Sequence, residues 1–225
     1  GKLSGMSAAA DAPDLIVSPA AVDLILAAEG LSHGEWPGGA SGVTIGHGYD
    51  LGYHTRDEFE TDWYGKLATE KMATLMPAVG VKGEAARNLA AQIGRVDIPA
   101  AIAGQVFMQV DLPRWIKRAA SLFYGYRLLS DEAQGALVSL VFNRGTALEG
   151  ETRREMKNLA ALLSQQSISA GNGQPTVGTY CRMAAEIRSM KRLWAGKKLG
   201  GLVRRREDEA VLIESTPCVV KALQS

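Results

Sequence analysis

The feature that most constrains this chain is the glycine-rich segment EWPGGASGVTIGHGYDLGYH at residues 35–54, in which six of twenty residues are glycine. So many glycines disfavour a helix, because each one loses backbone freedom when it is ordered. Val43, Ile45 and Tyr49 are spaced as short strand positions around Gly46 and Gly48. The segment therefore predicts a small β-hairpin.

The rest of the sequence has the three- and four-residue apolar spacing of helices. Ser18 and Pro19 are typical of a helix start, and Gly30 of a helix end. A capping box beginning at Thr55 predicts a second helix from about Arg56. Further helices are predicted at 85–93, 99–111, 113–123, 130–143, 152–164, 180–194 and 203–214, with a polar loop at 165–180. The predicted fold class is α+β, mostly α, with a small glycine-rich hairpin lobe and a larger helical lobe.

Composition excludes several classes of protein. Hydrophobic residues make up 46% of the 225 residues, enough for a core, and a net charge of +1 does not favour a nucleic-acid partner. No apolar run reaches the roughly 18 residues that cross a bilayer, so no membrane partner is expected. Residues 1–17 lack the apolar core of a signal peptide and predict a flexible leader. Cys181 and Cys218 fit no metal spacing, and either stay unpaired or form one disulfide.

Glu29 is the first candidate for chemistry, because it lies near the end of an apolar helix. Apolar neighbours and the negative end of the helix dipole both disfavour the charged form of a carboxyl group. A glutamate that stays protonated near neutral pH can act as a general acid. The alternative is an ordinary solvated glutamate at a helix end.

Three segments resemble phage-type lysozymes, glycoside hydrolase family 24. AAEG followed by GVTIGHGYDLG is similar to the family's helix-terminal Glu-Gly and its Thr-Ile-Gly-x-Gly hairpin, at the same separation. LSDEAQGALVSLVFNRG resembles the central cleft helix, and WAGKKLGGLVRRREDEAVL resembles the C-terminal segment. The resemblance implies a two-lobed lysozyme-like domain over 18–214, with a small lobe at about 30–60 and a helical lobe at about 80–214. Residues 215–225 are then a C-terminal tail.

The resemblance implies a monomeric muramidase that hydrolyses the β-1,4 bond between N-acetylmuramic acid and N-acetylglucosamine in peptidoglycan, without cofactor or metal. Glu29 would protonate the leaving oxygen and Thr44 would orient the attacking water. The family places an acid nine positions after the glutamate, where this chain has Gly38. Glu35 and Asp50 are the candidate replacements; otherwise Glu35 is a solvated loop acid and Asp50 a turn residue that caps backbone amides.

The missing acid leaves two alternatives open. A lytic transglycosylase cuts the same bond with one essential glutamate, since the 6-hydroxyl of muramic acid attacks in place of water. An inactive peptidoglycan-binding module would keep the cleft without turnover. Thr44, which is suited to holding a water, favours hydrolysis.

The resemblance also suggests substrate-binding residues. His47 would bind sugar hydroxyls or remain a solvated hairpin histidine, and Trp36 and Tyr49 would stack on sugar rings. Asn143 and Arg144 would bind N-acetyl groups or peptide stems; otherwise they are a helix C-cap and a surface arginine. A histidine metal site is not expected, because no second compact ligand pair accompanies His47 and Asp50.

Delivery is less constrained. The enzyme would act in the periplasm or cell wall, brought there by phage lysis, by a secretion system or within a longer protein. The basic segment 182–206 has nine basic residues and one acid, and is either a site for anionic wall polymers or a solvated helix face. The 165–180 loop is a candidate contact for an immunity protein.

Overall fold

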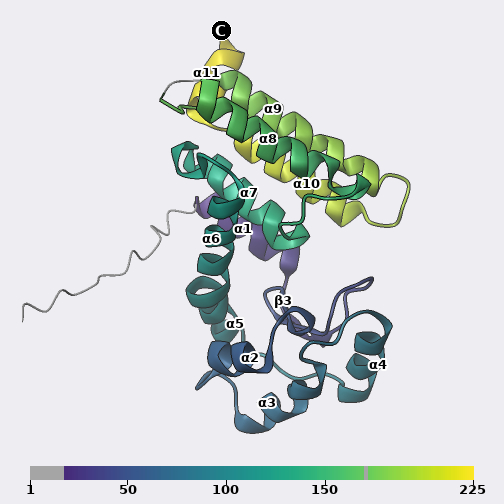
Figure 1. Cartoon of the computed structure of the whole chain (residues 1–225). Helices are drawn as coiled ribbons and strands as arrows, with labels where there is room; N and C mark the ends of the chain where they lie inside the picture. The colour runs from purple at the N-terminus through teal and green to yellow at the C-terminus, as the bar shows by residue number, and fades with distance from the viewer. Residues whose placement is uncertain (1–17, 170–171) are drawn as a thin grey trace, which may run out of the picture. The chain divides into compact units, whose positions relative to one another are not determined.

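The computed structural model describes residues 18–169 and 172–225 (Figure 1). The predicted leader and the middle of the 165–180 loop lie outside these residues. The chain divides into two compact units. We call Ile25–Arg114 the hairpin unit, and the described residues up to Leu24 together with Trp115–Ser225 the helical unit. The described chain is mostly helical with one small antiparallel sheet, which confirms the α+β, mostly α prediction.

Helix α1 (Pro19–Glu29) has the predicted bounds. The carbonyl of Ser18 accepts the first helical hydrogen bonds, from the N–H of Ala21 and Val22. Ala21 and Ile25, one helical turn apart, are fully buried. Gly30 ends the helix at φ 65°, a left-handed conformation that suits glycine.

The sheet of the hairpin unit has three strands in the order β1-β2-β3. Strands β2 (Thr44–Gly46) and β3 (Tyr49–Asp50) form the predicted hairpin. Strand β1 (Ser32–Glu35) was not predicted, because its sequence SHGE has no apolar alternation. Its outer edge is covered by the segment after α4, where Val96 donates its N–H to the carbonyl of His33 at 2.8 Å.

Four further helices belong to the hairpin unit: α2 (Arg56–Trp63), α3 (Thr69–Leu75), α4 (Gly83–Ile93) and α5 (Ala100–Val106). The predicted capping box is present at Thr55 and Glu58, with both reciprocal hydrogen bonds. Helix α3 was not predicted. The strands and helices enclose one core that includes Val43, Ile45, Leu51, Phe59, Trp63 and Leu75.

A π-helical turn at Phe107–Asp111 joins α5 to α6 (Leu112–Leu122). The helices predicted at 99–111 and 113–123 meet here without a break: α6 begins beside Pro113, and the helical path is continuous from Ala100 to Leu122. A proline has no N–H and frees the carbonyl four residues earlier. The wider π turn just before Pro113 accommodates that loss within one continuous path.

The helical unit contains α7 (Asp131–Arg144), α8 (Arg154–Ser169), α9 (Val177–Ser189), α10 (Gly200–Glu214) and α11 (Pro217–Gln224). Helix α10 packs on α7 and α9, and α8 packs on α9 (Figure 1). Residues 135–142 of α7 are buried without interruption, so α7 is a central helix of this unit.

Two predicted non-helical segments of this unit contain helix. Helix α8 continues through Ser169 and α9 begins at Val177, so the predicted 165–180 loop is much shorter. The predicted 215–225 tail includes α11. Among the described residues, none of the helices has both the length and the apolar composition needed to span a membrane.

The basic segment 182–206 is partly neutralised by acids of the helical unit. Arg188 pairs with Glu207 and Glu214, and Arg192 pairs with Glu151 and Glu155. The surface formed by this segment is therefore less positively charged than the sequence alone suggests. Most of these pairs are partly exposed and each contributes little to stability.

One polar cluster lies inside the helical unit, between α7 and α10. Glu209 is fully buried and binds Arg206 through both carboxylate oxygens, at 2.5 and 2.9 Å. Ser139 donates its hydroxyl to Glu209 at 2.6 Å, and Arg205 lies 3.7 Å from the same carboxylate. Such a cluster is satisfied only when all its members are present.

Replacing Glu209 by Gln should therefore destabilise the protein, because two buried guanidinium groups would lose their counter-charge. We expect a loss of about 3–5 kcal/mol in the free energy of unfolding, measured by urea denaturation. Glu149, whose side chain is 88% exposed beside Lys157, is the matched control, and Glu149→Gln should produce no measurable change. Equal effects of the two substitutions would contradict the prediction.

Candidate functional site

Glu29 is the last residue of α1 and is half-buried. The next residue, Gly30, accepts a hydrogen bond on its carbonyl oxygen from Nδ1 of His47, at 2.6 Å. His47 lies in the turn between β2 and β3, and its ring meets the edge of Phe107 in the π-helical turn, with ring centroids 6.1 Å apart. The hairpin turn is thus fastened to the helix end that carries Glu29.

Thr44 lies between the two candidate acids in the sheet. It pairs with Glu35 on β1 and with Asp50 on β3. Residues directly opposite each other in antiparallel strands project to the same face. The pairing shifts between His33 and Glu35 through a bulge at Gly34, whose φ is 97°. This bulge sets Glu35 opposite Thr44.

The side chain of Thr44 is held in a fixed orientation. Thr44 is 8% exposed, and its hydroxyl donates to the carbonyl of Gly42 at 3.2 Å. A hydroxyl that donates to the backbone still has oxygen lone pairs that accept a hydrogen bond from water. Thr44 can therefore orient a water molecule.

Asp50 binds the backbone of the hairpin. Its carboxylate accepts hydrogen bonds from the N–H of Gly42, at 3.0 and 3.1 Å, and from the N–H of Gly52, at 2.8 Å. Burial raises the pKa of Asp50, and the two backbone donors act in the opposite direction. The interpretation of Asp50 as a turn residue that caps amides is confirmed, and its oxygens are occupied by this role.

Gly42 and Gly52 are in close backbone contact below this carboxylate. A Cβ atom on Gly42 would lie 2.5 Å from the nitrogen of Gly52, and a Cβ atom on Gly52 would lie 2.7 Å from the carbonyl oxygen of Val81. Neither position has space for a side chain. The glycines at 42 and 52 are thus required by packing.

Glu35 differs from Asp50 in its surroundings. It is exposed at the end of β1, and one of its oxygens accepts the N–H of His33. The ring of His33 accepts the N–H of Ile98 on Nδ1 at 3.0 Å, which fastens β1 to the segment after α4. Glu35 is therefore the more accessible of the two carboxylates beside Thr44.

The predicted stacking role of Tyr49 was wrong. Its ring is 1% exposed, lies parallel to His54 with centroids 4.0 Å apart and meets Trp63 edge-on. Its hydroxyl donates to Asp62 at 2.6 Å, and Arg114 binds the same carboxylate with two nitrogens. Burial and this hydrogen bond raise the pKa of Tyr49. A strand of two residues does not reveal from sequence which face is buried.

The other predicted binding residues lie in two different places. Trp36 packs partly against the core of the hairpin unit, and its indole N–H donates to the carbonyl of Ser41 at 2.9 Å. Asn143 and Arg144 end α7 in the helical unit. Asn143 accepts a hydrogen bond from Arg206 at 2.9 Å, and Arg144 donates to the carbonyl of Thr152 at 2.8 Å.

The sequence interpretation missed an exposed aromatic residue near the hairpin. Tyr53 is 59% exposed, its hydroxyl donates to the carbonyl of Ala40 at 3.3 Å, and the ammonium of Lys82 lies 4.1 Å from its ring centroid. The sequence signal for Tyr53 is its position as the second tyrosine of GYDLGYH, directly after Gly52, the glycine that packs on Gly42.

The structure also bears on metals and thiols. No group of three or more potential metal ligands occurs within 18–169 and 172–225. Cys181 is free and exposed, while the side chain of Cys218 lies outside the described part of the chain.

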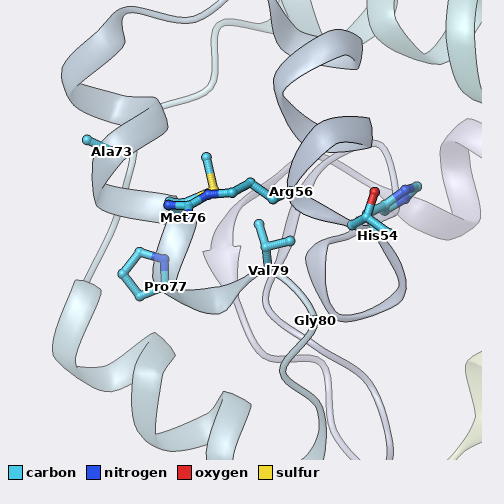
Figure 2. A pocket seen from close by; sticks show the side chains of 8 residues that line it. His54, Arg56, Ala73, Met76, Pro77, Val79 and Gly80 are labelled. Atoms are coloured by element: carbon cyan, nitrogen blue, oxygen red, sulfur yellow. The ribbon is translucent and has the colours of Figure 1, made fainter.

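A pocket of about 680 Å³ opens elsewhere in the hairpin unit, between the start of α2 and the segment that follows α3 (Figure 2). Its wall combines apolar side chains with two basic residues: His54, Thr55, Arg56, Ala73, Met76, Pro77, Val79 and Gly80. None of the predicted site residues lines it.

The hairpin unit is similar to one known family model. A family model described as a domain of unknown function (DUF8812) is similar to residues 32–111, which is less than half of the chain. The matched segment begins with β1 and ends with the π-helical turn, so it lies within the hairpin unit. It includes Thr44, Glu35 and Asp50 and begins just after Glu29. No curated protein matches the chain.

The contact between the two glycines generates a first prediction for this site. Gly42→Ala should lower the free energy of unfolding by about 1–3 kcal/mol, because the added methyl group overlaps backbone and the Asp50 carboxylate. Gly104→Ala is the control: Gly104 lies in α5, where an added Cβ meets nothing within 4 Å. It should stabilise the protein by about 0.5–1 kcal/mol. Chemical denaturation of both variants measures the two changes in the free energy of unfolding. Changes of the same sign in both variants would contradict the prediction.

His54 generates a prediction about pH. Burial lowers the pKa of His54 from its ordinary 6.5, helped by Arg114 and opposed by Glu58 and Asp62. The unfolded chain therefore binds a proton at His54 more readily than the folded chain does. The stability contributed by neutral His54 is present above pH 6.5 and is lost as the pH falls below it.

The substitution His54→Phe keeps a ring on Tyr49 and removes this titration. The difference in stability between wild type and His54→Phe, measured by denaturation at steps from pH 7.5 to pH 5, should shift in favour of the variant as pH falls. A difference that stays constant with pH would show that His54 does not titrate on unfolding.

Proposed function

We propose that this chain is a muramidase with a lysozyme-like fold, which hydrolyses the β-1,4 bond between N-acetylmuramic acid and N-acetylglucosamine in peptidoglycan. The observation that carries the proposal is the local arrangement in the hairpin unit. His47 joins the hairpin turn to Gly30, directly after Glu29, and Thr44 lies in one sheet row with two carboxylates. The resemblance of AAEG and GVTIGHGYDLG to phage-type lysozymes supports the same conclusion.

Glu29 is the proposed general acid. It is the last residue of α1 and is half-buried. It donates its proton to the glycosidic oxygen as the bond to the anomeric carbon breaks, so the leaving sugar departs as a neutral hydroxyl. The hydrogen bond between His47 and Gly30 keeps this helix end at the hairpin.

Thr44 and Glu35 complete the proposed mechanism. Thr44 orients the attacking water, and Glu35 accepts a proton from it. Inverting glycosidases separate the two carboxyl groups by roughly 6.5–9.5 Å to leave room for this water. We assign Asp50 a positioning role because its oxygens hold Gly42 and Gly52. His47 donates from Nδ1 to Gly30, so in the neutral ring Nε2 is an acceptor for a sugar hydroxyl.

The products distinguish hydrolysis from its alternatives. Purified peptidoglycan digested by a hydrolase yields muropeptides with reducing ends, whereas a lytic transglycosylase yields 1,6-anhydro ends. A binding module releases no muropeptide. Mass spectrometry of the soluble products therefore tests the reaction type. Products with 1,6-anhydro ends would contradict hydrolysis and support a lytic transglycosylase, the alternative that the missing acid at Gly38 leaves open.

Substitutions in the purified protein test the assigned roles. Glu29→Gln should lower kcat by about 10²–10⁴-fold, the usual contribution of a general acid, and leave binding to peptidoglycan intact. Glu35→Gln should lower kcat without changing stability. Asp50→Asn should lower stability together with activity. The assignment of Glu29 as general acid fails if Glu29→Gln retains full activity. If only Asp50→Asn loses turnover, and does so at unchanged stability, then Asp50 is the base and Glu35 is not.

A further inference from the structure

Tyr53 and Lys82 form a fixed pair on the surface of the hairpin unit. The phenol hydroxyl is tied to Ala40, and the ammonium group lies over the ring. Tyr53 keeps 59% of its surface exposed despite these contacts, and Lys82 is also exposed. An exposed tyrosine usually rotates freely, but this ring is held at its hydroxyl end and at its face. The pair thus presents an ordered apolar surface beside an ordered positive charge.

The loop that leads to Ala40 carries little side-chain bulk. Gly38 and Gly39 precede Ala40, and a Cβ atom at either glycine would meet nothing within 4 Å. Both glycines have positive φ, at 121° and 57°. The loop that binds the phenol hydroxyl therefore adds no side-chain bulk at these two positions.

The pair is close to the proposed reaction site. Lys82 forms a backbone bridge with Gly42, and Gly42 precedes Thr44 by two residues of extended chain, about 7 Å. Lys82 is also close enough to act on Asp50. Burial raises the pKa of Asp50, and the positive charge of Lys82 is one of the influences that lower it. Asp50 is in turn the sheet partner of Thr44.

We propose that Tyr53 and Lys82 form a binding subsite for an anionic glycan, in which the phenol ring contacts the apolar face of a sugar and the ammonium group binds a carboxylate attached to it. The inference rests on the proposed function, and it names the substrate feature that this part of the surface recognises. In peptidoglycan, the lactyl group of muramic acid and the peptide joined to it supply carbonyl and carboxylate oxygens next to the sugar ring. An uncharged N-acetylglucosamine polymer offers the sugar face alone.

The experiment compares two probes, purified peptidoglycan sacculi and soluble chitin oligosaccharides. Tyr53→Ala should weaken binding to both, and should raise KM on peptidoglycan about two- to fivefold at unchanged kcat, as expected for one contact at an exposed site. Lys82→Met should weaken binding to sacculi by a similar factor and leave binding to chitin oligosaccharides unchanged. Tyr53→Phe keeps the ring and should retain most of the affinity.

Tyr64, which is 85% exposed in the same unit, provides the matched control, and Tyr64→Ala should change neither KM nor binding. Thermal melts of all variants verify that the fold is intact. An active wild type whose KM is unaffected by Tyr53→Ala and Lys82→Met overturns the subsite alone. A wild type that binds sacculi through these residues but releases no muropeptides keeps the subsite and overturns hydrolysis. A wild type that neither binds nor cleaves overturns both.

Discussion

The carboxylate of Asp50 organises the hairpin unit. It receives the N–H groups of Gly42 and Gly52, two backbone segments that lie too close for any side chain between them. The Gly42 carbonyl then orients the hydroxyl of Thr44, and Gly42 bridges Lys82 at the start of α4. A carboxylate that is partly withdrawn from water is costly unless its oxygens are satisfied, so half-buried Asp50 and the two glycines depend on each other. The orientation of Thr44 follows from that contact.

The sequence was sufficient for elements whose signals are local. The proline and glycine at the ends of α1, the capping box of α2 and the apolar run of α7 lie within or beside the helices that they specify. Strand β1 lacks such a signal, because its stability comes from pairing with β2 and from the segment around Val96. The π-helical turn before Pro113 also depends on context, since the same proline fits a helix start equally well.

The candidate site was predictable in its residue types but not in its division of roles. Glu35 and Asp50 are both acids near Thr44 in sequence. Only the register shows that one lies on each side of Thr44, and only the hydrogen bonds show that Asp50 is committed to backbone donors. Tyr49 and Tyr53 likewise differ only in environment, one in the core and one exposed. Within 182–206, Arg192 pairs with Glu151, 41 residues away along the chain, which local sequence patterns do not reveal.

The two acids beside Thr44 explain how the chain can dispense with a carboxylate at Gly38 under the proposed mechanism. A general base needs an oxygen that is open to water, and a positioning residue needs its oxygens occupied. Asp50 satisfies the second condition, and exposed Glu35 satisfies the first. The bulge at Gly34 sets Glu35 opposite Thr44, so that one acid can act as base while Asp50 holds the backbone. A one-residue change of register reverses the face on which every following side chain lies. Without the bulge, Glu35 would project from the face opposite to Thr44, and the row would contain one committed carboxylate and no base.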